Sequence, residues 1–148
     1  MTLLGNERGA GAAVQALGFR GELDKLTSLA TERGATADPM IRQRLMRAHT
    51  KVEIMRFFGY KALTSFLKGT APGADASIGK LFWSHHHQEI TELAIDVLGA
   101  DAMVPTGQTP QRAFGCDAPG SPNDTANWAG VFFNARAGTI YAGTSQVQ

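Results

Sequence analysis

The sequence predicts an all-α protein built as a helical bundle, and three observations carry this prediction. Apolar residues recur at spacings of three and four along residues 38–68 and again along residues 75–98, as they do when one face of a helix is buried. The first of these stripes lasts about seven turns, a length typical of helical bundles. Signals that start and stop helices lie at the ends of both stretches.

The first helix is expected over about residues 3–32. Its apolar positions run from Ala10 to Leu29 with helical spacing. Glycine is frequent there, although each glycine inside a helix costs about 1 kcal/mol relative to alanine. The glycines are Gly5, Gly9, Gly11, Gly18 and Gly21. Their number predicts either close approach by a neighbouring helix or a ligand, or a break in the helix between residues 18 and 21.

Two more long helices are expected, over about residues 38–68 and 75–98. Gly34 ends the preceding helix, because glycine is a common C-terminal stop. Asp38 and Pro39 begin the next helix as its N-cap and its first helical residue. The two apolar stripes are Ile41, Leu45, Ala48, Val52, Met55, Gly59, Ala62 and Phe66, followed by Ile78, Leu81, Phe82, His85, Ile90, Leu93, Ala94 and Val97.

The last third of the chain has a different pattern. Prolines and glycines alternate without a period over residues 100–124, which predicts a long loop that is either functional or covered by a partner. A short helix is expected over residues 125–137, and an extended segment over residues 139–141. Ser145 and Gln148 form a capping box, which normally opens a helix. We therefore expect residues 1–148 to be one domain cut from a larger protein.

Composition excludes several classes of function. A length of 148 residues suits one domain, and a net charge of +1 indicates no partnership with nucleic acid. The longest apolar stretches are too short to span a membrane, and residues 1–8 lack the plan of a signal peptide. The single cysteine, Cys116, rules out an internal disulfide framework and fits a reducing compartment. A cytoplasmic location is expected.

Three consecutive histidines, His85, His86 and His87, suggest a metal site with Glu89 at first sight. Consecutive residues on a helix point in three directions, however, and the sequence shows no further ligand cluster. We therefore predict no metal site. His85 lies on the apolar stripe and is expected to be a core or interface residue.

Short motifs spread over the whole chain resemble one family. The run IYAGTSQVQ at residues 140–148 closely resembles a conserved turn of acyl-CoA dehydrogenases, and FNAR at residues 133–136 is similar to the segment that precedes that turn. Residues 77–84 and 92–99 are similar to the family's third bundle helix, and residues 4–9 resemble the start of its first. The resemblance implies an up-and-down four-helix bundle of the acyl-CoA dehydrogenase C-terminal type, with a long loop and a short extra helix, in a divergent bacterial branch.

The same resemblance implies a flavin-dependent reaction. The family removes an α-proton and a β-hydride from an acyl-CoA thioester, and the cofactor FAD takes the hydride. The implied partners are the acyl-CoA substrate, an acceptor like electron-transfer flavoprotein, and either a homo-oligomer (dimer or tetramer) or a heteromeric partner subunit. This domain is expected to be inactive alone. The alternatives are a non-catalytic subunit of a heteromeric dehydrogenase and a helical interaction module.

A carboxylate must take the α-proton, and the resemblance implies where it lies. Many members carry a glutamate in the conserved turn, but this chain has Ala142 there. A second branch of the family carries its glutamate on the first bundle helix, directly before an arginine, and Glu7 and Arg8 match that pair. Glu7 is therefore the expected general base, because a desolvated glutamate has a pKa closer to the working pH. Arg8 is expected to contact the substrate.

The conserved turn is expected to contact both substrate and cofactor. The resemblance implies that the backbone N–H of Ala142 binds the thioester carbonyl, which stabilises the developing enolate. It also implies that Thr144 and Gln146 bind FAD, while Tyr141 and Gly143 contact the substrate.

Overall fold

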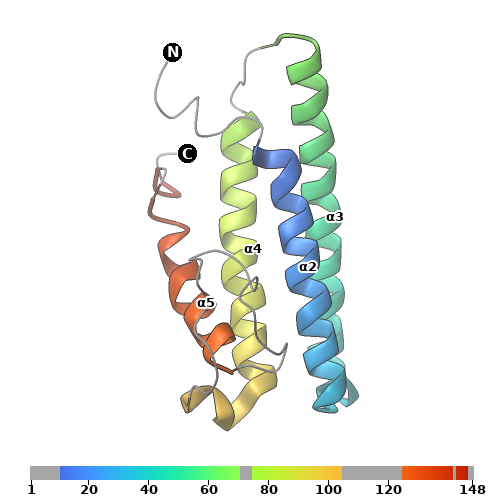
Figure 1. Cartoon of the computed structure of the whole chain (residues 1–148), viewed down its shortest axis with the longest axis vertical. Helices are drawn as coiled ribbons and strands as arrows, with labels where there is room; N and C mark the ends of the chain where they lie inside the picture. Colours follow the sequence, from blue (N-terminus) through green and yellow to red (C-terminus); the bar gives the residue numbers. More distant parts are fainter. Residues whose placement is uncertain (1–10, 71–74, 105–124, 142, 147–148) are drawn as a thin grey trace.

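The computed structural model describes residues 11–70, 75–104, 125–141 and 143–146, and the regular elements in these residues are all helical. In chain order they are α2 (Gly11–Glu32), η1 (Ala35–Ala37), α3 (Pro39–Leu67), α4 (Asp75–Leu98), η2 (Gly99–Met103) and α5 (Thr125–Ala137). Figure 1 shows α2, α3 and α4 running alternately up and down, with α5 along α4. The predicted all-α helical bundle is confirmed.

The connection between α2 and α3 forms by the local rules that its sequence obeys. Gly34 has φ 69°, the left-handed conformation that glycine adopts most easily, and it ends α2. The Asp38 carboxylate accepts a hydrogen bond of 2.7 Å from the backbone N–H of Met40, with Pro39 as the first residue of α3. The predicted N-cap is confirmed.

One hydrophobic core joins the four α-helices of the described residues. Leu26 and Leu29 on α2 and Ile90 on α4 are at most 1% exposed, and Trp128 on α5 is fully buried. Burying a side chain of this size contributes roughly 1.5–3 kcal/mol, so residues from every helix share in stabilising the bundle. The core is Ala16, Phe19, Leu23, Leu26, Leu29, Ala30, Leu45, Ala48, Val52, Met55, Ile90, Leu93, Ala94, Val97, Leu98, Trp128 and Val131.

The predicted apolar stripes are longer than the parts of α3 and α4 that are buried. On α3 the buried positions end at Gly59, and Phe66 is 71% exposed. In Figure 1 the last turns of α3 extend beyond the first described turns of α2 and α4. On α4, Ile78 and His85 are exposed, so His85 is not a core residue, and its alternative place at an interface stays a prediction.

Gly18 and Gly21 neither break α2 nor lie close to another described helix. The helix is continuous through Gly18 and Gly21, so the suggested break is absent from the described residues. A Cβ added at either glycine meets no atom within 4 Å, so neither glycine serves close packing within the described part of the chain. Gly5 and Gly9 lie outside the described residues.

The chain after α5 is a turn and not the predicted extended segment. The backbone N–H groups of Ile140 and Tyr141 both donate to the carbonyl of Ala137, at 2.9 and 3.1 Å. These hydrogen bonds prolong the last turn of α5, and an extended segment could not form them. The expected loop over residues 100–124 begins with helix η2, and residues 105–124 lie outside the described residues.

Within the described residues, no helix combines the length and the apolar character that crossing a membrane requires.

Gly21→Ala should raise the free energy of unfolding by about 0.5–1 kcal/mol, because alanine loses less conformational entropy than glycine when it enters a helix. The added methyl group meets no atom within 4 Å, so it should cause no clash. Urea denaturation of the chain followed by circular dichroism measures this change. Gly34→Ala is the matched control and should destabilise, since φ at Gly34 is 69°. Destabilisation by Gly21→Ala would instead mean that a part of the protein outside the described residues packs against this face of α2.

Candidate functional site

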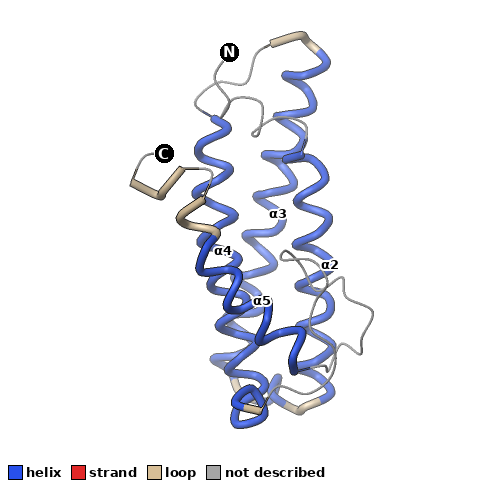
Figure 2. The backbone as a smooth tube through the Cα atoms, turned by 60° about the vertical axis from the view of Figure 1, so that its left-hand side comes forward, coloured by secondary structure: helices blue, strands red, loops and turns tan. Residues whose placement is uncertain are grey.

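The candidate site is the turn at residues 138–146, which follows α5 and lies beside the first half of α4 (Figure 2). The turn closes on itself through a hydrogen bond of 3.2 Å from the Ser145 N–H to the carbonyl of Thr139. Gly143 has φ 94°, a conformation that side chains with a Cβ rarely adopt. The turn therefore has a defined backbone course that depends on glycine at this position.

Helix α4 holds the turn through one polar and one aromatic contact. The Lys80 ammonium is buried, at 6% exposure of the residue, and donates to the carbonyl of Gly143 at 2.7 Å. The ring of Trp83, one helical turn further on, lies 6.3 Å from that of Tyr141. Trp83 also passes close to Gly138, where an added Cβ would meet its ring at 3.4 Å. The two side chains of α4 thus hold both the start and the centre of the turn.

Aromatic packing extends from the turn to α2. Phe19 stacks on Trp83 with ring centroids 6.2 Å apart, and its ring is edge-on to His86 and His87 at 5.4 and 5.5 Å. Aromatic pairs in these geometries add roughly 0.5–1.5 kcal/mol beyond their buried area. The position of the turn is therefore coupled through Trp83 to the helix on which Glu7 was predicted to lie.

The structure describes four of the seven predicted site residues. Tyr141, Gly143 and Thr144 are half-buried in the turn, and Gln146 is exposed at its end. Burial raises the pKa of the Tyr141 hydroxyl above its usual 10. These four lie in one turn because they are near neighbours in the sequence, and their roles in binding substrate and cofactor stay predictions.

The other three predicted site residues, Glu7, Arg8 and Ala142, lie outside the described residues. Gln148 lies outside them as well, so the predicted capping box stays a prediction. Its first member, Ser145, has a buried hydroxyl oxygen with no hydrogen-bond partner among the described residues.

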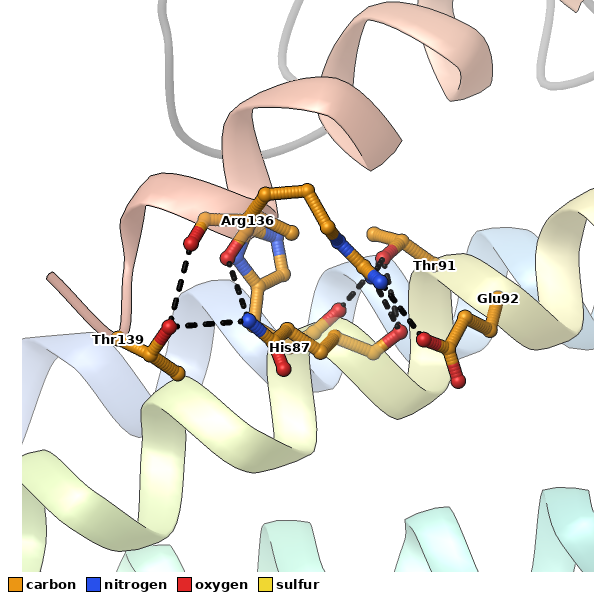
Figure 3. Close-up of polar contacts among 7 residues, drawn as sticks. His87, Thr91, Glu92, Arg136 and Thr139 are labelled. Atoms are coloured by element: carbon orange, nitrogen blue, oxygen red, sulfur yellow. Dashed lines mark hydrogen bonds and ion pairs between the residues drawn. The ribbon is translucent and has the colours of Figure 1, made fainter. Parts of the chain in front are cut away.

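Arg136 fastens α5, and with it the turn, to α4 (Figure 3). Its guanidinium donates to the Glu92 carboxylate at 2.7 Å and to the carbonyl of Gln88 at 3.2 Å. The Gln88 amide in turn donates to the hydroxyl of Thr139 at 3.2 Å, and the guanidinium lies 4.6 Å from the ring of Phe132. Arg136 belongs to the FNAR segment, whose resemblance to the family thus falls on a residue that positions the turn.

The three histidines divide between solvent and core. His85 is exposed, whereas His86 and His87 are 1% and 3% exposed. The Nε2 atom of His87 lies 3.2 Å from a carboxylate oxygen of the buried Glu22 on α2, a pair that the sequence analysis did not predict. Among the described residues, neither ring nitrogen of His86 has a hydrogen-bond partner. Burial, and then the charges of Lys51 and His87, lower the pKa of His86 from 6.5 to about 3.

The described residues contain no group of three or more histidines, cysteines or carboxylates able to hold a metal ion. His85 is exposed while His86 and His87 both lie against Phe19, and His87 also contacts Glu22.

Lys80 and Trp83 were missed as site residues, although both lie in the segment over residues 77–84 that carries part of the family resemblance. A signal existed, because a lysine among Ile78, Leu81 and Phe82 sits in an apolar stretch of helix. Only the contact with Gly143, 63 residues along the chain, shows what this lysine does.

Comparisons with known proteins identify the family of this chain. The family described as "Acyl-CoA dehydrogenase, C-terminal domain" matches residues 1–148. Acyl-CoA dehydrogenase IpdE1 of Mycobacterium tuberculosis is 32% identical over 100% of this chain and 34% of its own length. Its namesake in Mycolicibacterium smegmatis is 30% identical over 96% of this chain and 31% of its own length. The chain therefore spans about a third of the curated relatives that it matches.

Solved structures show the same fold. Two structures of the Tcur3481-Tcur3483 steroid ACAD, one of them a variant, align with TM-scores of 0.72 for the variant and 0.68. Sequence identities are 21% and 22%, and the alignments cover 97% and 99% of this chain but 35% of each of those chains. The chain belongs to the acyl-CoA dehydrogenase family and corresponds to its C-terminal helical domain.

Because the pKa of His86 is lower in the folded chain than in the unfolded one, the unfolded chain takes up the proton first as the pH falls. The contribution of His86 to the free energy of unfolding should therefore be constant above pH 6.5. It should decline between pH 6.5 and about 3, with a slope of up to about 1.4 kcal/mol per pH unit.

His86→Leu should remove that slope and raise the free energy of unfolding at neutral pH by about 1–3 kcal/mol, since it removes buried polar atoms without partners. Urea titrations at a series of pH values measure both effects. His85→Leu changes an exposed neighbour and should keep the slope of the parent chain. Equal slopes in His86→Leu and the parent chain would exclude His86 as the cause.

Proposed function

We propose that this chain is the C-terminal domain of an FAD-dependent acyl-CoA dehydrogenase, which oxidises the Cα–Cβ bond of an acyl-CoA thioester to give a 2-enoyl-CoA. The observation that carries the proposal is the conserved turn, whose described residues are held on α4 by Lys80 and Trp83. The family assignment supports it over the whole chain. Since the chain spans about a third of its relatives, the rest of the flavin site belongs to other parts of such an enzyme.

The described residues of the turn fit FAD by the chemistry of their donors. Thr144 is half-buried and Gln146 is exposed at the end of the turn, and they provide a hydroxyl and an amide. The buried hydroxyl of Ser145, without a partner among the described residues, adds a third polar group. We assign FAD binding to Thr144 and Gln146, because neutral donors and acceptors suit the polar edge of a flavin. When bound, FAD supplies the chemistry of hydride acceptance.

The proposed proton transfer uses Glu7. The carboxylate of Glu7 takes the α-proton of the thioester, and the backbone N–H of Ala142 donates to the thioester oxygen as negative charge develops there. A backbone donor is independent of the side chain at this position, so alanine in place of glutamate leaves it intact. Arg8, Tyr141 and Gly143 are assigned to substrate contacts.

The assembly follows from the family and stays a proposal. We propose that the enzyme forms either a homo-oligomer or a complex with a second, different subunit. Its electrons pass to an acceptor like electron-transfer flavoprotein. Ala142 favours one second candidate function, because a chain without a carboxylate in the turn also suits a non-catalytic subunit. Glu7 distinguishes the two.

Glu7→Gln in the complete enzyme should reduce the rate of flavin bleaching by acyl-CoA by roughly 10²–10⁴-fold, because glutamine cannot take a proton. Stopped-flow absorbance measures the bleaching rate, and the spectral shift on substrate binding should persist. Glu32→Gln changes an exposed glutamate of α2, serves as the control and should bleach like the parent enzyme.

Bleaching at the parent rate by Glu7→Gln would exclude Glu7 as the base. A parent enzyme that binds flavin but is not bleached by any acyl-CoA would favour the non-catalytic subunit.

A further inference from the structure

We propose that Lys80 is a positioning residue for the conserved turn: its ammonium holds the Gly143 carbonyl and so sets the direction and strength of the neighbouring backbone N–H donor. This inference rests on the proposed function, which assigns the N–H of Ala142 to the substrate and the hydroxyl of Thr144 to FAD, and it adds the N–H of Thr144 as a further donor to the bound substrate or cofactor. It adds a residue from another helix that the family resemblance did not assign to the site.

The burial of Lys80 is the first argument. Lysine side chains usually extend along a helix surface until the ammonium reaches water. Lys80 lies within the first two turns of α4, yet it is only 6% exposed. A buried ammonium is unfavourable unless strong acceptors surround it. The 2.7 Å bond to the Gly143 carbonyl is a short charge-assisted hydrogen bond of that kind.

The geometry of the peptide unit is the second argument. The Gly143 carbonyl and the Thr144 N–H belong to one planar peptide unit, and in a trans peptide they point in opposite directions. Holding the carbonyl on Lys80 therefore directs the Thr144 N–H away from α4. The positive charge also polarises this peptide unit, which makes the N–H a stronger donor. Gly143 permits this arrangement with its φ of 94°.

Trp83 restricts the remaining freedom of the turn. It packs against Tyr141 two residues before Gly143 and against Gly138 at the start of the turn. With Phe19 stacked on its ring, Trp83 cannot easily move away. Removing Lys80 should thus leave the turn attached to α4 but release the peptide unit between Gly143 and Thr144. Removing Lys80 should therefore change the orientation of the Thr144 N–H without changing the fold.

The test compares three variants in the complete, FAD-containing enzyme. Lys80→Met keeps the length of the side chain without its charge, Lys80→Arg keeps the charge, and Lys68→Met removes an exposed lysine as the control. We expect Lys80→Met to lower kcat roughly 10–100-fold with a smaller change in KM, as displaced reacting groups do. The reduction potential of the bound flavin should become more negative, because a buried positive charge near the turn favours the reduced, anionic flavin. Lys80→Arg should recover part of both losses.

A purely structural lysine gives a different result. In that case the melting temperature of Lys80→Met falls, but kcat per bound flavin and the reduction potential equal those of Lys68→Met, and this outcome would overturn the proposal. If Lys80→Met does not fold, Lys80→Gln, which keeps a neutral donor, takes its place with the same two readouts. A parent enzyme that neither binds FAD nor is bleached by acyl-CoA contradicts the proposed function itself, whereas an active parent with an unchanged Lys80 variant contradicts only the role of Lys80.

Discussion

The packing of α5 on α4 is the interaction on which the candidate site depends. Trp128 and Val131 are fully buried in the shared core, and Arg136 spans the two helices with hydrogen bonds to α4. The turn directly follows α5, so the position of the turn depends on how firmly α5 is packed on α4. Because apolar burial and charged hydrogen bonds act together here, the turn reaches Lys80 at a definite point along α4.

Helix α4 carries an unusual amount of buried polar chemistry for the centre of a bundle. Ser84 and Thr91 satisfy their hydroxyls with backbone carbonyls of their own helix, and His87 lies against Glu22. His86 is the exception, with two ring nitrogens that lack partners among the described residues. Such groups reduce stability, because a buried polar atom without a partner has lost its bonds to water.

Much of the fold could be predicted from the sequence, because helix boundaries depend on local chemistry. Gly34, Asp38 and Pro39 act within a few residues of themselves, and the structure shows each where it was expected. Exposure depends instead on which helix lies opposite. Phe66 continues the apolar stripe of α3 but is exposed among the described helices, and the spacing of apolar residues cannot show where the neighbouring helices end.

The sequence by itself determined the helices, their caps and the family to which the turn belongs, since these reside in short-range patterns and motifs. Tertiary structure alone decided which of three consecutive histidines is exposed, that Glu22 meets His87, and that Lys80 reaches Gly143. The last two contacts join residues more than 60 positions apart. Their partners are chosen by how the helices pack, and packing is a property of the whole core that no local segment encodes.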